Sequence, residues 1–319
     1  MSNTELQIHF DIIVADGFVL SELASIADVL RIANRVCPRP HFTFAYHSLR
    51  GGQITSSAQA SVQTETIPRQ GQADYVFVIG NSDPDQPDLS LTRVVSDYTF
   101  RGAQVFLLAE AASRYIKDKG ADNHATHWEN ASFLRERGSG FDAKFSIATE
   151  HGQVVTCAGM GATTDIILAV IGRHISGAAK MTVADIMLHE NIRDFSSMQP
   201  FSGVKSTKTG DIKLDQCIEI MQANIEEPVP INEIVSALGL SNRSLERKFR
   251  SYMGTTPNGF YREMRLAKAN NLLLNTTMTV REIGFACGFP NGFSAVYKSV
   301  YGVTPFVLRR QRRAESAGC

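Results

Sequence analysis

INEIVSALGLSNRSLERKFRSYMGTTP, residues 231–257, recurs in altered form as VREIGFACGFPNGFSAVYKSVYGVTP, residues 280–305. Residues of like character return 49 positions later and, after one residue is lost, 48 positions later: Ile234 as Ile283, Gly239 as Gly288, Phe249 as Tyr297, Gly254 as Gly302 and Pro257 as Pro305. Each copy has the pattern of an apolar helix that stops at a glycine, a tight turn, and a second amphipathic helix. A repeat of this kind indicates a repeated structural unit. The sequence therefore predicts two helix-turn-helix motifs, at about 231–252 and 280–301, each able to present its second helix to the major groove of DNA.

Helical patterns also precede and join the two motifs. A helix is predicted over 212–224 and a long connecting helix over 257–274, so residues 212–313 are predicted to form an all-α DNA-binding domain. Residues 205–319 carry 16 Lys+Arg and 10 Asp+Glu, a net charge of +6, whereas residues 1–204 carry 16 and 22, a net charge of −6. A basic module beside an acidic remainder favours double-stranded DNA as a partner.

The N-terminal two thirds have a different pattern, in which apolar strands alternate with amphipathic helices. Such alternation predicts an α/β domain with a largely parallel, flavodoxin-like sheet and helices on both faces. Strands are predicted at 7–14, 41–48, 74–79, 103–109 and 153–157, and helices at 20–34, 88–99, 127–136, 160–175 and 178–190. We place this domain at 1–195 and expect an exposed linker at 196–211, which is rich in Ser, Thr, Gly and Lys.

Cysteine usage and the N-terminus indicate the compartment. The five cysteines are scattered and no pair has CxxC spacing, so we predict neither a disulfide framework nor a zinc site, and no cofactor. The N-terminus, MSNTELQIHF, lacks the basic and apolar segments of a signal peptide. No apolar run approaches the roughly 18 residues of a membrane span. We therefore expect a cytoplasmic protein that makes no membrane contact.

Particular segments resemble two known families. LSNRSLERKFRSYMGTTP (240–257), YREMRLAKANNLLL (261–274) and VREIGFACGF (280–289) are similar to the AraC/XylS family, and the similarity extends over 212–313. The first domain contains DGF…ADVLRIAN (16–34), DYVFVIGN (74–81), ATHWENASFL (125–134) and VVTCAGMGATTDIILAVI (154–171). These segments resemble the class I glutamine-amidotransferase-like, PfpI-type domain, which is fused to an AraC-type domain in one branch of bacterial regulators. The resemblance implies a transcription regulator.

Catalytic members of the PfpI-type superfamily carry a cysteine on a sharp turn between a strand and a helix. Here that turn is expected at Ala109–Ala111, where Ala-Glu-Ala-Ala replaces the Gly-rich turn of the family, and no cysteine lies between Cys37 and Cys157. Without a thiolate, this chemistry lacks its nucleophile. We therefore predict no catalytic residues and no enzyme activity. The competing interpretation is an intracellular hydrolase or amidase with an accessory DNA-binding domain.

A pocket without chemistry suits a metabolite sensor. The candidate ligand-binding residues, near predicted strand ends and helix starts, are Glu22, Asn81, Glu110, His127, Trp128, Cys157 and Met160. Glu110, expected at the position of the missing nucleophile, would attract a cation, and Trp128 would add a cation–π contact. The structural alternatives stay open: Glu110 as a helix-cap neighbour, His127 as a cap or core hydrogen-bonding group, Trp128 as core, and Cys157 as a small buried hydrophobe.

Candidate DNA-binding residues lie on the polar faces of the two predicted recognition helices: Asn242, Arg243, Ser244, Glu246, Arg247, Arg250, Asn291, Ser294 and Lys298. Arg243 and Arg247 are the predicted base readers because arginine binds guanine O6 and N7 bidentately, with phosphate contact as the open alternative. The second helix has few base-reading groups, so we expect it to hold the DNA backbone through Lys298. The run Arg309–Arg313 is interpreted as a solvated basic tail, with phosphate contact as the alternative.

The family branch also implies the remaining partners. Its members often respond to small nitrogenous metabolites such as amino acids, glycine betaine or carnitine. A homodimer is expected, and RNA polymerase would be a further partner of an activator. A third interpretation makes the first domain a dimerisation module only. A ligand-induced shift in melting temperature would distinguish sensing from dimerisation alone.

Overall fold

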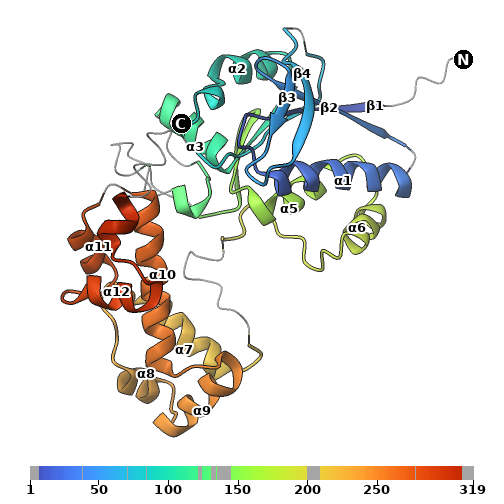
Figure 1. Cartoon of the computed structure of the whole chain (residues 1–319). Helices are drawn as coiled ribbons and strands as arrows, with labels where there is room; N and C mark the ends of the chain where they lie inside the picture. The colour runs from blue at the N-terminus through green and yellow to red at the C-terminus, as the bar shows by residue number, and fades with distance from the viewer. Residues whose placement is uncertain are drawn as a thin grey trace, which may run out of the picture. The chain divides into compact units, whose positions relative to one another are not determined.

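The computed structural model describes residues 7–310 apart from 38, 70, 84, 121–123, 131–133, 135–144, 200–208 and 277. The chain divides into two compact units, Met1–Gln199 and Pro200–Cys319, called here unit 1 and unit 2 (Figure 1). Unit 1 is an α/β fold and unit 2 is helical, which confirms the predicted fold class.

Unit 1 contains an eight-stranded sheet with the order β3-β4-β2-β1-β5-β6-β8-β7. Its strands are β1 (Gln7–Ile13), β2 (His41–Ser48), β3 (Gly52–Thr55), β4 (Ser61–Thr66), β5 (Tyr75–Val78), β6 (Gln104–Leu108), β7 (Ala148–His151) and β8 (Val154–Cys157). The six inner strands of this order, β4-β2-β1-β5-β6-β8, all pair in parallel. The two edge strands, β3 and β7, pair antiparallel with their neighbours. The five strands expected from the sequence are all present, and the three that were missed lie at or next to the edges of the sheet.

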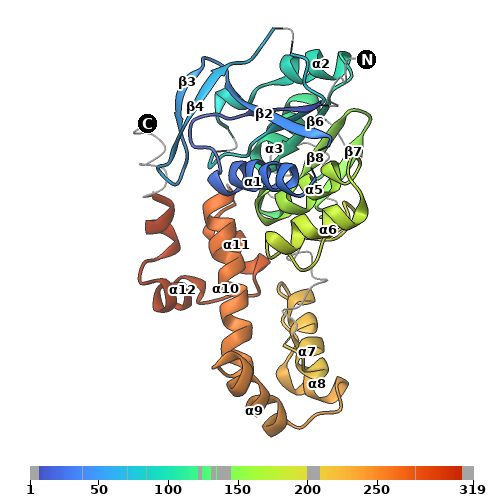
Figure 2. The same cartoon turned by 90° about the vertical axis from the view of Figure 1, so that its right-hand side faces the viewer.

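Helices cover both faces of this sheet (Figures 1 and 2). The first face packs against α1 (Leu20–Val36), α5 (Thr163–Ile171) and α6 (Gly177–Ile186), and the second against α2 (Thr92–Phe100) and α3 (Ala109–Lys119). Phe77 and Phe106 point into the first core, and their neighbours Val78 and Leu107 point into the second. Because both faces are buried, the central strands are continuous apolar runs instead of alternating ones.

Three turns meet at the carboxyl ends of the central strands. The turn after β5 holds Gly80 and Asn81, the turn after β6 leads directly into α3, and the turn after β8 leads through η2 (Met160–Ala162) into α5. A further short helix, η1 (Pro87–Leu89), precedes α2, so the helix expected over 88–99 is split. The carboxyl edge of a parallel sheet is where such folds bind ligands.

Unit 2 consists of two helical cores joined by one long helix. Its helices are α7 (Ile212–Ala223), α8 (Ile231–Ala237), α9 (Asn242–Met253), α10 (Pro257–Asn275), α11 (Val280–Ala286) and α12 (Phe293–Tyr301). The first core contains Leu245 and Phe249 of α9, and the second contains Phe293 and Tyr297 of α12. The pairs α8–α9 and α11–α12 are the two predicted helix-turn-helix motifs.

Local capping explains where the motif helices begin. Ser241 caps α9 through its hydroxyl, which accepts a hydrogen bond from Ser244 N, and Thr279 and Glu282 form a capping box at the start of α11. The sequence placed Asn291 on the last recognition helix, but α12 begins at Phe293. Gly292 precedes it in a left-handed conformation (φ 72°), so Asn291 lies in the turn.

Two residues expected in exposed segments are instead held by hydrogen bonds. Gln199, expected in the linker, is only 2% exposed because its side chain is hydrogen-bonded inside unit 1; residues 200–208 lie outside the described part of the chain. Arg309, expected in a solvated tail, donates to the carbonyl oxygens of Met278 and Thr276, whereas residues 311–313 are not described. Among the described residues, no helix combines the length and apolar character needed to cross a membrane.

Candidate functional site

The turn between β6 and α3 has the sharp geometry of a nucleophile elbow, but it carries no nucleophile. Ala109 has a positive φ of 43°, which is uncommon for a residue with a Cβ and marks the strained position. The sequence put Glu110 at that position, and the structure shifts the assignment by one residue: Ala109 is the elbow residue, and Glu110 follows it in the first turn of α3. The sharp turn is therefore kept even though its glycines are replaced.

Two glycines allow the neighbouring turns to approach the elbow closely. A Cβ on Gly80 would lie 2.8 Å from Glu110 Oε2 and 3.0 Å from Glu22 Oε2. A Cβ on Gly159 would lie 2.8 Å from Ala109 Cβ and would also overlap Glu22 Oε1. Only glycine fits at these two positions, so the three turns are packed tightly around the side chains of the site.

Glu22, near the start of α1, holds two of these turns together. Its Oε2 accepts a hydrogen bond from Gly80 N (2.8 Å), and its Oε1 accepts one from Met160 N (2.7 Å). The side chain is fully buried, and this burial raises the pKa of the carboxyl to about 7, although the two amide hydrogen bonds oppose the shift and nearby Glu110 adds to it. Glu22 is thus both a structural acceptor and a carboxyl whose charge changes near neutral pH.

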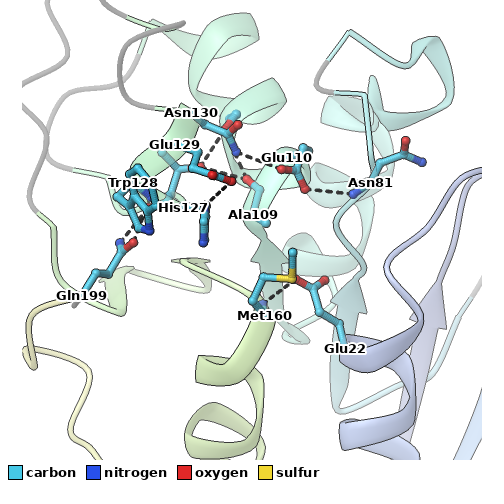
Figure 3. A network of polar contacts seen from close by, with 12 residues as sticks. Glu22, Asn81, Ala109, Glu110, His127, Trp128, Glu129, Asn130, Met160 and Gln199 are labelled. Carbon is cyan, nitrogen blue, oxygen red and sulfur yellow. Dashed lines mark hydrogen bonds and ion pairs between the residues drawn. The ribbon is translucent and has the colours of Figure 1, made fainter. Parts of the chain in front are cut away.

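The Glu110 carboxylate lies across the same turns (Figure 3). Its Oε2 accepts a hydrogen bond from Asn81 N (3.0 Å), and its Oε1 accepts one from Asn130 Nδ2 (3.1 Å). Burial raises the pKa of this carboxyl, and the hydrogen bonds from Asn130 and Asn81 oppose that shift. Its charge is therefore supported by two neutral donors.

The other predicted ligand-binding residues differ from Glu22 and Glu110, and from one another, in their burial and contacts. The rings of His127 and Trp128 lie against each other with centroids 5.5 Å apart, and His127 Nδ1 is 3.5 Å from Glu129 Oε2. Burial lowers the pKa of His127. Met160 is 45% exposed at the rim, whereas Cys157 is fully buried in the core beneath the site, where desolvation raises its thiol pKa.

The structure also adds residues that sequence reasoning missed. Asn130 and Thr126 both lie in the ATHWENASFL block that carried the family resemblance, and Gly80 lies in DYVFVIGN. Asn130 binds Glu110, and Thr126 Oγ1 donates to Ala109 O (2.9 Å). The blocks themselves were a signal, but the sequence did not show which of their residues face the elbow.

The first recognition helix, α9, presents a polar face opposite its buried apolar residues. Arg243, Arg247 and Arg250 are exposed, as are Asn242 and Glu246, while Ser244 is half-buried. Asn242 Nδ2 donates to Asn232 Oδ1 of α8 at 3.1 Å, so this amide is engaged within the motif. Lys248 is held by an ion pair with Asp211. The arginines are therefore the cationic groups that α9 can offer to DNA.

The second recognition helix, α12, presents a sparser face. Ser294, Ala295 and Lys298 are exposed. A surface hollow of about 530 Å³ lies between α11 and α12, and Arg281, Phe289, Asn291 and Phe293 are among the residues that line it. Among the described residues, no group of three His, Cys, Asp or Glu side chains is arranged to hold a metal ion.

Comparisons with known proteins show which proteins this chain is similar to. A family model described as a helix-turn-helix domain matches residues 234–311. The HTH-type transcriptional regulator ArgR of Pseudomonas aeruginosa is 35% identical over 256 residues, covering 77% of this chain and 76% of that protein. The HTH-type transcriptional regulator GlxA of Rhizobium meliloti is 29% identical over 302 residues, covering 92% and 93%.

A solved structure, that of an AraC family transcriptional regulator from Pseudomonas putida, is also similar to this chain. The match has 19% identity and a TM-score of 0.48, and it covers 56% of this chain and 99% of that one. With the paired helix-turn-helix motifs of unit 2 beside the α/β fold of unit 1, the chain belongs to the AraC family of HTH-type transcriptional regulators, whose partner is DNA.

Proposed function

We propose that this regulator is controlled by a small nitrogenous metabolite, cationic or zwitterionic, that binds beside the β6–α3 elbow. Unit 2 then binds its operator through α9 and α12, with Arg243 and Arg247 reading bases and Lys298 holding the DNA backbone. The expected assembly is a homodimer, and RNA polymerase is a further partner if the protein activates transcription.

The observation that carries this proposal is a pair of carboxyls without a counter-ion, one of them fully buried (Glu22) and the other partly buried (Glu110). Among the described residues, neither Glu22 nor Glu110 lies within ion-pair distance of a Lys, Arg or His nitrogen. Burying a carboxylate without a cation is costly, and the raised pKa values of both groups reflect that cost. A cation bound beside them would offset the cost, so the site favours cationic ligands over anionic ones.

The elbow supports sensing better than catalysis. The side chain of Ala109 is a methyl group, and Cys157, at the end of the neighbouring strand β8, is fully buried with a raised thiol pKa. A thiol in that state is a poor nucleophile because the thiolate is the reactive form. We therefore propose that unit 1 binds its ligand without transforming it.

A melting-temperature screen of the full chain against amino acids and methylated amines tests the ligand class. Glycine betaine is a useful probe because its quaternary ammonium stays charged at every working pH. We expect it to raise the melting temperature of the wild-type protein, since a ligand that binds only the folded state stabilises it. Glu110→Gln should abolish this shift while leaving DNA binding intact.

The matched control is Asp97→Asn, which removes an exposed carboxylate of α2. It should respond to the probe as the wild type does. If Glu110→Gln kept the wild-type affinity and only melted slightly earlier, Glu110 would be a cap of α3 and no part of a sensor. Its place in the first turn of α3 makes that alternative specific.

A further inference from the structure

The segment that leads from unit 1 toward unit 2 in the sequence is paired with the edge of the sheet. We call residues 193–199 the exit segment. Its backbone bonds run antiparallel to the start of β7: Ala148 N to Phe195 O (3.0 Å), Ile147 N to Ser197 O (2.8 Å) and Gln199 N to Phe145 O (2.6 Å). The exit segment thus ends in an isolated antiparallel β-bridge, Ser146 with Met198, and is attached at its last described residue.

The Gln199 side chain ties the exit segment to the site (Figure 3). Its Nε2 donates to Thr126 O (2.7 Å) and to Ser146 O (3.0 Å), and its Oε1 accepts from Trp128 N (2.9 Å). With 2% exposure, the amide is almost completely removed from water. A buried amide with three partners has one well-defined position, and losing that position costs all three hydrogen bonds together.

Thr126 continues the connection to the elbow itself. Its hydroxyl donates to Ala109 O (2.9 Å) and lies 2.6 Å from Ser113 Oγ, which also contacts Ala109 O at 3.2 Å. Two hydrogen-bonded steps, Ala109 to Thr126 and Thr126 to Gln199, therefore separate the strained turn from the exit segment. Asn130, which binds Glu110, lies in the same short stretch as Thr126.

A second attachment reaches the opposite wall of the site. Arg193 Nε and Nη2 donate to Asp165 Oδ2 at 2.9 and 2.6 Å, and Nη2 also donates to Gly161 O at 3.2 Å. Asp165 is fully buried, so this pairing is sheltered from water and salt. Gly161 follows Met160, whose amide is bound by Glu22. The exit segment is thus bonded directly to the turn after β8 and, through Thr126, to the turn after β6.

We propose that the exit segment transmits occupancy of the elbow site to the DNA-binding unit, and that Gln199 is the residue that couples them. This inference rests on the proposed sensing function. A cation that binds Glu22 and Glu110 changes how the turns at Ala109 and Met160 are held, and the Thr126–Gln199 bonds respond to that change. Gln199 seated and Gln199 released are the two states whose balance the ligand shifts.

A purely structural role for Gln199 predicts a different result. In that case, removing its hydrogen bonds lowers the free energy of unfolding, but the response of DNA binding to the ligand is unchanged. The coupling role predicts loss of the response even in a variant that is folded and still binds the ligand. Coupling of this kind is typically about 5- to 150-fold in affinity and is reciprocal between the two ligands.

The experiment uses the full chain with Gln199→Ala and Gln199→Glu, and Gln153→Ala as the matched control at an exposed turn between β7 and β8. A DNA duplex is first selected from a random pool with the wild-type protein. Its Kd is then measured with and without saturating glycine betaine. We expect the two Kd values to differ at least about fivefold in the wild type and in Gln153→Ala. They should be equal in both Gln199 variants, although glycine betaine still raises their melting temperatures.

The possible failures are distinguishable. If the Gln199 variants keep the wild-type ratio of Kd values, the coupling inference is wrong while sensing stands. If glycine betaine leaves the wild-type melting temperature unchanged, the proposed ligand fails. The ligand-free Kd then tests the coupling: we expect Gln199→Ala to differ from Gln153→Ala at least about fivefold. Equal ligand-free Kd values would overturn the inference.

Discussion

Glu22 shows how one side chain can serve both structure and regulation. Its carboxyl accepts hydrogen bonds from the amides of Gly80 and Met160, and its pKa of about 7 means that its charge changes near neutral pH. Because the folded pKa lies above the ordinary value of 4.5 for a glutamate, the protonated form stabilises the fold at low pH. That contribution is fully present below pH 4.5 and is lost as the pH rises through 7.

The same titration predicts a pH dependence of ligand binding. About a tenth of a group with a pKa of 7 is ionised at pH 6 and about nine tenths at pH 8, so a ligand with a permanently charged ammonium group should bind roughly tenfold more tightly at pH 8. Calorimetry with glycine betaine across this range measures the effect. Glu22→Gln, which keeps the size of the side chain, should flatten the profile. Tighter binding at the lower pH would contradict the assignment of a cation site.

The recognition helices give a second prediction for single residues. Arg243→Ala or Arg247→Ala should weaken binding to the selected duplex by about 1–3 kcal/mol and relax base preference, because a bidentate contact to guanine is lost. Lys298→Ala should weaken binding to all sequences alike and lower the salt dependence by about one unit. Fluorescence anisotropy over a salt series separates the two. Changed base preference in Lys298→Ala would show that α12 reads sequence.

At the scale of elements, α10 is not the sole feature that fixes the position of one helix-turn-helix motif relative to the other. Tyr261 of α10 belongs to the first core and Leu266 to the second. Arg265 lies between them, donates to the carbonyl oxygens of Cys287 and Gly288, and stacks 4.0 Å over the Phe289 ring. Arg265 thereby attaches the turn of the second motif to α10, the helix that follows the first motif.

Gly288 gives this junction a sharp test. A Cβ at Gly288 would lie 2.6 Å from Pro228 Cγ and 2.7 Å from Ile225 O in the loop before α8, whereas its repeat equivalent Gly239 has nothing within 4 Å. Both have positive φ, 70° and 63°. Gly239→Ala should therefore cost only the backbone strain, about 1–2 kcal/mol. Gly288→Ala should cost more and should also weaken duplex binding by disturbing the spacing of the motifs. Equal losses in stability and affinity would show that the contact is unimportant.

The sequence predicted the elements whose patterns are local. The internal repeat predicted both helix-turn-helix motifs, and the continuous apolar runs predicted the central strands. It missed β3 and β7 because edge strands have exposed, polar residues and no apolar run. It missed the Gln199–Thr126 contact because the partners are 73 residues apart, and a segment rich in Ser and Gly has the composition of a linker even where it is paired.

The assignment of the elbow shows the same limit. The sequence correctly placed a strand-to-helix turn within Ala109–Ala111, but which residue takes the strained conformation depends on where β6 ends. That end is set by its pairing with β8, in which Leu108 lies opposite Cys157. Strand register is a tertiary property, so the one-residue shift from Glu110 to Ala109 could not be read from local pattern.

At the scale of the whole chain, regulation requires the acidic α/β unit to change the DNA affinity of the basic helical unit. The two carry opposite net charges and separate cores, and the exit segment is the last described part of unit 1 before unit 2 begins. A ligand shifts DNA binding only by as much as it distinguishes the two states of the chain. A ligand with equal affinity for both states would raise the melting temperature but would leave the DNA affinity unchanged.

The most direct test of this account is the Kd of the full chain for its selected duplex, measured at pH 8 with and without saturating glycine betaine, in wild type and Glu110→Gln. We predict a change of at least about fivefold in the wild type and none in Glu110→Gln, with the two proteins binding the duplex equally in the absence of the compound. A wild-type protein that binds glycine betaine but keeps the same Kd would contradict control of DNA binding through the elbow site.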